Sequence, residues 1–138
     1  MSGRDFLDTN ILVYAYDVTD SAKQRIARQL LVRAVAAEFT TSTQVLAEFA
    51  CTLLHKLQPP LNAEQILLAL DSLGPIPLIT PDSDLVRRAV EARSAFGVHF
   101  YDGMIIAAAE RAGSRKIWSE DLNAGQKYFG AEVVNPFI

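Results

Sequence analysis

Acidic side chains stand at four widely separated positions where the chain is expected to leave a strand or enter a helix. Asp8 and Asp121 each follow a short apolar segment. Asp102 precedes an apolar segment, and Glu48 lies near the start of an amphipathic one. Because the ligands of a parallel α/β sheet collect outside the carboxyl ends of its strands, we expect the four carboxylates to meet at one edge of such a sheet.

A cluster of carboxylates requires a counter-charge. Two unit charges ~4 Å apart repel by about 4 kcal/mol at an effective dielectric constant near 20, so clustered carboxylates either bind a cation or keep their protons. Ligands that are all oxygen select hard cations, which makes Mg²⁺ or Mn²⁺ the matching cofactor. Such ions activate water and stabilise a leaving oxygen. The four acids therefore predict metal-assisted hydrolysis of a phosphodiester.

Each acid also has a simpler interpretation. Asp8 or Asn10 can serve only as the N-cap of a helix that starts near residue 11. Asp102 is favoured in the first turn of a helix by the helix dipole, worth typically ~0.3–1 kcal/mol. Glu48 lies on a polar helix line, and Asp121 can cap a turn. The metal-site prediction depends on the four acids together.

The composition indicates one globular domain spanning residues 1–138. Half of the residues are hydrophobic and 21% are charged, as is usual for a protein with a sizeable core. The longest apolar stretch, near residues 104–109, is too short to span a membrane, and residues 1–4 lack the apolar centre of a signal peptide. Cys51, the only cysteine, is expected to pack as a small apolar group and fits a reducing cytoplasm.

The formal net charge of −3 argues against a nucleic-acid partner, because such proteins usually carry a basic surface. Without the four proposed site acids, however, 12 acids face 13 bases, a balance of +1. Two bound divalent cations would also change −3 to +1. The acidity can therefore belong to the site, which leaves nucleic-acid binding open.

Alternating apolar patterns predict an α/β fold, a three-layer α/β/α sandwich with a short, mostly parallel sheet. Asn62 and Gln65 are expected to form a capping box, and Thr80 the hydroxyl cap of a later helix. Gly97 and Gly113 are expected to end helices. We expect strands near residues 6–7, 39–41, 75–79, 116–118 and 132–134, and helices near 11–16, 20–38, 43–57, 62–73, 80–96 and 102–112.

Other chemistries lack their sequence signatures. His55 and His99 do not have zinc-ligand spacing with another histidine or cysteine. No G-x-S-x-G elbow, G-x-G-x-x-G fingerprint or phosphate-binding loop motif occurs in the chain.

Five segments, taken in order, give the chain a family resemblance. They are residues 5–14 (DFLDTNILVY), 43–49 (TQVLAEF), 101–109 (YDGMIIAAA), 118–122 (WSEDL) and 133–137 (VVNPF). In this order and spacing the chain resembles PIN-domain nucleases, most closely the VapC-type toxins of toxin–antitoxin pairs. The resemblance implies a PIN-like fold and a Mg²⁺- or Mn²⁺-dependent endoribonuclease.

The resemblance also assigns roles to individual residues. It implies that Asp8, Asp102 and Asp121 hold the metal directly, whereas Glu48 binds a water on the metal or a second ion. Polar support would come from Asn10 and Ser119. The family's acid positions do not include Asp5 and Glu120, which we interpret as structural or exposed. The family often has alanine where this chain has Gly103, and we expect the glycine to loosen the start of its helix slightly.

The implied partners are RNA, a small antitoxin protein and a second copy of the chain. The homodimer face is expected in segments 11–16 and 45–57, which carry more large apolar residues than one thin core layer requires. No membrane association is expected. Candidates for contacts with RNA phosphates are Lys23, Arg25, Arg28, Arg87, Arg88 and Arg93.

Three alternatives remain from the sequence. The chain can be a PIN-domain nuclease of RNA maturation without a toxin role, or a non-catalytic binding module, although retention of all four acids argues against the latter. An aspartyl-phosphate phosphatase usually has two aspartates separated by one residue, whereas two residues separate Asp5 from Asp8.

Overall fold

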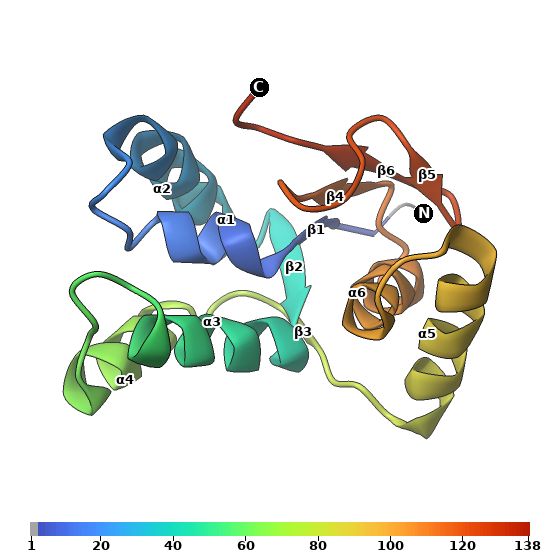
Figure 1. Cartoon of the computed structure of the whole chain (residues 1–138), viewed down its shortest axis with the longest axis horizontal. Coiled ribbons are helices and arrows are strands. Elements are labelled where there is room, and N and C mark those ends of the chain that lie inside the picture. The colour runs from blue at the N-terminus through green and yellow to red at the C-terminus, as the bar shows by residue number, and fades with distance from the viewer. Residues whose placement is uncertain (1–2) are drawn as a thin grey trace.

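The computed structural model describes residues 3–138, which form a six-stranded sheet with helices on both faces (Figure 1). The signal-peptide expectation falls partly on residues 1 and 2, which lie outside the described residues. The strand order is β3-β2-β1-β4-β6-β5, and β5 alone runs antiparallel to its neighbour. The strands are β1 (Asp5–Leu7), β2 (Phe39–Ser42), β3 (Leu78–Ile79), β4 (Lys116–Trp118), β5 (Lys127–Tyr128) and β6 (Ala131–Val134).

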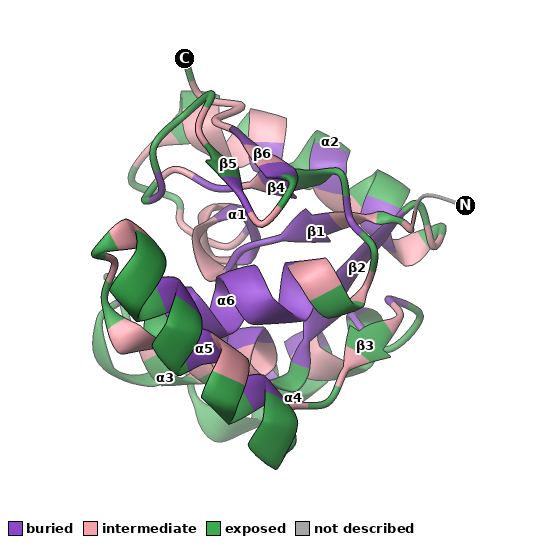
Figure 2. Ribbon diagram, turned by 90° about the vertical axis from the view of Figure 1, so that its right-hand side faces the viewer, coloured by how far each residue is buried: buried purple, intermediate pink, exposed green. Residues whose placement is uncertain are grey.

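The connections between parallel strands divide the helices between the two faces. Crossovers of this kind are almost always right-handed. The chain moves outward from β1 through β2 to β3 and then returns to β4 on the other side of β1, so the last helix pair lies opposite the earlier ones. Figure 2 shows α5 and α6 in front of the strands and α2 behind them. The helices are α1 (Thr9–Tyr14), α2 (Ser21–Val35), α3 (Thr43–His55), α4 (Ala63–Ser72), α5 (Ser83–Phe96) and α6 (Phe100–Arg111).

The predicted three-layer α/β/α architecture is therefore confirmed. Its central helix is α6, in which every residue from 103 to 109 is buried. Among the side chains in this core, Phe6, Ile117 and Val133 come from three adjacent parallel strands. None of the helices in residues 3–138 is long and apolar enough to cross a membrane.

Gly103 lets α6 approach α5 closely. A Cβ atom at this position would lie 2.6 Å from the carbonyl oxygen of Ala89 in α5. That distance is too short for any contact with a backbone atom, so the glycine is required by packing between the helices. The sequence suggested only that Gly103 loosens the start of the helix slightly and did not reveal this packing role.

Several helix ends match the sequence patterns. The capping box of Asn62 and Gln65 is present at the start of α4, and Gly97 ends α5 in the left-handed conformation. The predicted hydroxyl cap of α5 is wrong, because Asp82 and not Thr80 is its N-cap. The Asp82 carboxylate accepts a hydrogen bond from the backbone N–H of Leu85, at 2.9 Å.

Two further expectations are corrected. The α2 helix ends at Val35, before Ala37, which adopts a positive φ of 64° and so lies outside the helix. Cys51 is exposed. The buried line of α3 includes Phe49 and Leu53, and at about 100° per residue Cys51, two positions from each, faces the opposite way.

The sheet differs from the predicted one at its two edges. The strand expected over residues 75–79 is only two residues long, and β5 was not predicted. A strand of two residues shows no period from which alternation can be recognised. Both edges lie away from the acids considered below.

We expect Gly103→Ala to lower the free energy of unfolding by about 1–3 kcal/mol, the usual cost of over-packing. Helix propensity alone predicts a gain of about 1 kcal/mol, so the sign of the change, measured by urea denaturation, distinguishes the two effects. Ser94→Ala, at an exposed position of α5, is the control and should change stability by less than ~0.5 kcal/mol. A Gly103→Ala protein as stable as the wild type would contradict the close helix contact.

Candidate metal centre

The candidate site lies where the order of the strands reverses, at the carboxyl ends of β1 and β4. From β1 the chain proceeds to β2 on one side, and it later returns to β4 on the other. In open α/β sheets this switch point is where ligands bind. The ladder extends to the site, because the N–H of Asp8 donates to the carbonyl of Trp118 at 3.0 Å. Asp8 and the turn after β4 are thereby held side by side.

Asp8 is a buried carboxylate with both oxygens in use. It is 5% exposed, and its Oδ1 accepts the N–H of Thr9 at 2.7 Å as the N-cap of α1. Its Oδ2 accepts the hydroxyl of Ser119 at 2.8 Å. Asp8 is thus a helix cap and also a member of the acid cluster. Burial raises the pKa of Asp8 to about 6, the two hydrogen bonds oppose this rise, and the negative charges of Asp121 and Glu48 add to it.

Glu48 reaches the site from α3, on one face of the sheet. Its Oε1 accepts hydrogen bonds from the hydroxyl of Thr9 and from the amide Nε2 of Gln44, each at 3.2 Å. Partial burial raises its pKa, and the charges of Asp102 and Asp121 raise it further, while the two hydrogen bonds oppose this. The polar face of α3, which the sequence suggested is solvated, therefore places Gln44 and Glu48 at the acid cluster.

Asp102 enters from the opposite face, in the first turn of α6. His99 is the N-cap of this helix, and its Nδ1 accepts the N–H of Tyr101 at 3.2 Å. Burial raises the pKa of Asp102, and the negative charge of Asp121 raises it as well, whereas His99 lowers it. Sequence reasoning gave His99 no role, because a histidine cap has no characteristic spacing.

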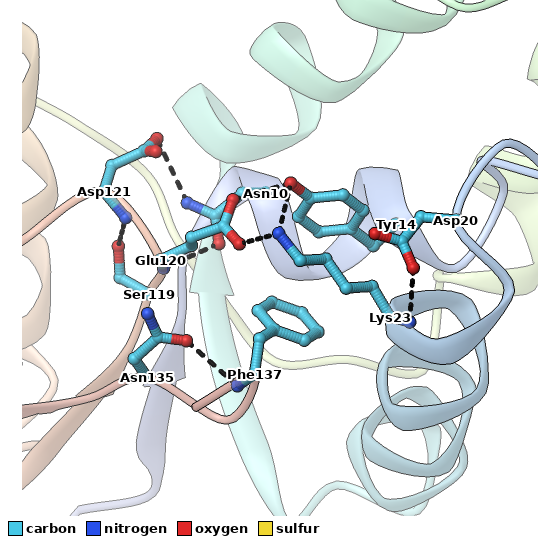
Figure 3. A network of polar contacts seen from close by, with 9 residues as sticks. All are labelled: Asn10, Tyr14, Asp20, Lys23, Ser119, Glu120, Asp121, Asn135 and Phe137. Carbon is cyan, nitrogen blue, oxygen red and sulfur yellow. Dashed lines mark hydrogen bonds and ion pairs between the residues drawn. The ribbon is translucent and has the colours of Figure 1, made fainter.

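Asp121 is exposed and is positioned by its turn (Figure 3). Its Oδ2 accepts the side-chain amide of Asn10 at 3.2 Å, and its backbone N–H donates to the Oγ of Ser119 at 3.1 Å. The other side of the Asn10 amide accepts the backbone N–H of Glu120 at 3.1 Å. Asn10 and Ser119 therefore tie the turn after β4 to Asp8 and α1.

Glu120, next to Asp121, has a different set of partners. It forms an ion pair with Lys23 of α2 and accepts the phenol of Tyr14 at 2.6 Å (Figure 3). Although burial opposes the change, these two contacts lower the pKa of Glu120. This matches the expectation that Glu120 is structural. The pair also occupies Lys23, which the sequence suggested as a contact to RNA.

The other basic residues suggested as RNA contacts also differ in whether partners within the protein already occupy them. Arg88 pairs with Glu110 at 2.8 Å and lies over the ring of Phe129, and Arg28 donates to the carbonyl of Ala15 at 2.9 Å. The candidates that are exposed and have no ion pair among the described residues are Arg25, Arg28, Arg87 and Arg93, of which Arg28 has the hydrogen bond to the Ala15 carbonyl.

Negative charges within the acid cluster raise the pKa values of Asp8, Glu48 and Asp102, but the four acids do not enclose an ion. Within residues 3–138, no three His, Cys, Asp or Glu side chains are close enough together to hold a metal. Binding would therefore require side-chain rotation, with oxygens brought to about 2.0–2.6 Å from the ion. The donors suit a hard cation, because all are carboxylate oxygens. Beside them lies an open cavity of about 380 Å³ whose walls include Asn10, Glu48 and Asp121.

Comparison with known proteins places the chain in a family. The PIN-domain sequence profile matches residues 6–129, so the chain belongs to the PIN-domain family. The fold is similar to a toxin–antitoxin complex from Klebsiella pneumoniae, with a TM-score of 0.71 and 20% identity over 96% of this chain and 97% of that one. No curated protein matches the chain.

Two further solved structures share the fold. VapC20 of Mycobacterium tuberculosis, described as a sarcin–ricin-loop-cleaving toxin, has a TM-score of 0.67 and 18% identity over 85% of this chain and 89% of that one. VapBC2 from Rickettsia felis, described as bound to a DNA fragment from its promoter, has a TM-score of 0.67 and 19% identity over 95% and 97% of the two chains. The predicted family and the PIN-like fold are confirmed.

The raised pKa of Asp8 predicts a stability that falls as pH rises. Because the folded pKa of about 6 exceeds the ordinary 3.8, this group favours folding fully below pH 3.8, and the benefit is lost as pH rises through 6. In EDTA, Asp8→Asn removes this titration. Between pH 4 and 7 the variant should therefore gain roughly 2 kcal/mol in unfolding free energy relative to wild type. Urea denaturation across this range measures the difference, and a constant difference would exclude the buried, titrating Asp8.

Proposed function

We propose that this chain is a metal-dependent endoribonuclease, the toxin of a toxin–antitoxin pair. The observation that carries the proposal is electrostatic. Asp8, Glu48 and Asp102 all have raised pKa values, through burial and through the charges of other acids in the cluster. A protein of the PIN-domain family that holds such a cluster at the switch point of its sheet is arranged to bind a cation.

The proposed ligands are Asp8, Asp102 and Asp121, with Glu48 beside them. When bound, Mg²⁺ or Mn²⁺ supplies the Lewis acidity that activates water and stabilises the leaving oxygen. Thr9 and Ser119 fix the orientation of the Asp8 carboxylate by one hydrogen bond to each oxygen.

The attacking water would be oriented by Glu48. Thr9 and Gln44 both bond to its Oε1, and Oε2 accepts no hydrogen bond from the described residues. Oε2 is therefore the atom that can accept a proton from water. The raised pKa of Glu48 makes it a better base than an ordinary glutamate.

RNA phosphates would be contacted by Arg25, Arg87 and Arg93, which are exposed and, unlike Arg28, are not bonded to a backbone carbonyl among the described residues. Each such contact releases counterions, so affinity should fall as salt rises. Lys23 and Arg88 are less suited to this role because carboxylates already neutralise them.

The proposed partner is an antitoxin, because a structure similar to this fold is described as a toxin–antitoxin complex. The proposed homodimer needs a different face from the one expected. Segments 11–16 and 45–57 direct most of their large apolar side chains into the core, and Leu54 is their one large apolar residue described as exposed. Exposed apolar side chains lie instead on α4, as Leu67 and Leu68, and, on the opposite face of the sheet, on α5, as Val86 and Val90.

Cleavage is the direct test of the nuclease. Purified protein should cut single-stranded RNA in Mg²⁺ or Mn²⁺ and stop when EDTA is added. Asp8→Asn should reduce the cleavage rate at least about 100-fold, because it removes a ligand charge with little change in volume. Asp71→Asn, at an exposed position on α4, is the matched control and should cut normally. Undiminished cutting by metal-stripped protein or by Asp8→Asn would reject the site.

The toxin role is tested through the partner. The protein alone should be a dimer by light scattering, and it should form a tight complex with the product of an adjacent small gene that suppresses cleavage. A monomer at high concentration contradicts the dimer. If the adjacent gene product neither binds nor inhibits, the toxin role fails while the nuclease stands, and RNA maturation becomes the better interpretation.

A further inference from the structure

A second hollow lies next to the acids and shares Glu48 with the larger cavity. Its volume is about 280 Å³, and its other walls are Gln44, Ala47, Cys51 and Tyr101. The α3 residues follow one another at helical spacing, and Tyr101 faces them from the start of α6. Tyr101 directly precedes Asp102 in the chain, and Glu48 of the acid cluster lines the hollow itself.

Tyr101 presents an exposed aromatic ring that is held in place from two sides. The side chain is 56% exposed. Its ring stacks on His99, with centroids 5.7 Å apart and planes at 23°, and meets the edge of Phe100 at 5.3 Å. A ring held in this way loses little further conformational freedom when another flat group stacks on it.

Gln44, another residue of the wall, contains a polar atom without a hydrogen-bond partner among the described residues. Gln44 donates its amide N–H groups to Glu48 and to the carbonyl of Tyr101, at 3.2 and 3.1 Å. Its Oε1 is buried and has no hydrogen bond among the described residues. Most buried acceptors are paired, and an exception calls for an explanation. Because Oε1 is shielded from solvent, a ligand in the hollow would reach it only after the Gln44 side chain turns.

The chemistry of this hollow fits a nucleobase. Ala47 and Cys51 give it small apolar walls, Tyr101 gives it an aromatic face, and neighbouring acids make it unfavourable for a phosphate. Bases of single-stranded RNA splay out and stack on aromatic side chains. Given the proposed function, we propose that Tyr101 and Gln44 form a subsite for the base of a nucleotide next to the cleaved phosphate.

RNA binding by Tyr101 variants tests the subsite. The assay is fluorescence anisotropy with labelled single-stranded RNA, in an Asp8→Asn background so that RNA stays intact. Tyr101→Phe should bind as the parent does because it keeps the ring. Tyr101→Leu should bind about tenfold more weakly, within the range for one lost base–aromatic stack. A series of RNAs, each with one abasic nucleotide, locates the stacked base.

The RNA that lacks the stacked base should bind the parent about tenfold more weakly than intact RNA does. Tyr101→Leu should bind this abasic RNA no worse than it binds intact RNA, because the same contact is already lost. The subsite is overturned if Tyr101→Leu binds intact RNA as tightly as the parent, or if Tyr101→Phe loses as much as Tyr101→Leu. It is also overturned if Tyr101→Leu weakens binding of the antitoxin but not binding of RNA. Cleavage by the wild type distinguishes this failure from failure of the nuclease. If the wild type cuts RNA and Tyr101→Leu does not weaken RNA binding, only the subsite is rejected.

Discussion

The carboxylate of Asp8 is held out of water at the point where the sheet changes direction, and this sets the requirements for the residues around it. With 5% of the residue exposed and a pKa raised to about 6, Asp8 is costly to ionise at neutral pH without a counter-charge. Hydrogen bonds from Thr9 and Ser119 offset part of that cost. Three further acids approach from α3, from α6 and from the turn after β4. Of these, Glu48 and Asp121 increase the cost of ionising Asp8 further, and either a bound proton or a cation relieves it.

The turn after β4 shows how neighbouring acids acquire opposite roles. Asp121 faces the acid cluster, whereas Glu120 turns to Lys23 and Tyr14 and has a lowered pKa. Asn10 bridges both residues, through its side-chain nitrogen to Asp121 and its oxygen to the Glu120 backbone. One acid is thereby stabilised by a cation of the protein itself. The other stays free to bind a cation from solution.

Local patterns predicted most of the fold because its elements are specified locally. The capping box at Asn62 and the order of strands and helices could be recognised within a few residues of sequence. The failures involve distant partners. The need for glycine at position 103 comes from the close Ala89 backbone, and the role of Lys23 comes from its ion pair with Glu120, 97 residues away. For the site, strand-end position drew attention to the acids, but the hydrogen bonds of Thr9 and Gln44 to Glu48 depend on tertiary packing that no spacing reveals.

Binding of Mn²⁺ followed by electron paramagnetic resonance tests most directly whether the acid cluster is a cation site. Free Mn²⁺ gives a strong signal that is lost on binding, and added Mg²⁺ should restore it by competition. The electrostatic account predicts saturable binding of one or two ions by the wild type, a large loss of affinity in Asp8→Asn and no loss in Glu120→Gln, whose side chain is turned away from the cluster. Failure of the wild type to bind Mn²⁺, or equal binding by Asp8→Asn, would contradict it.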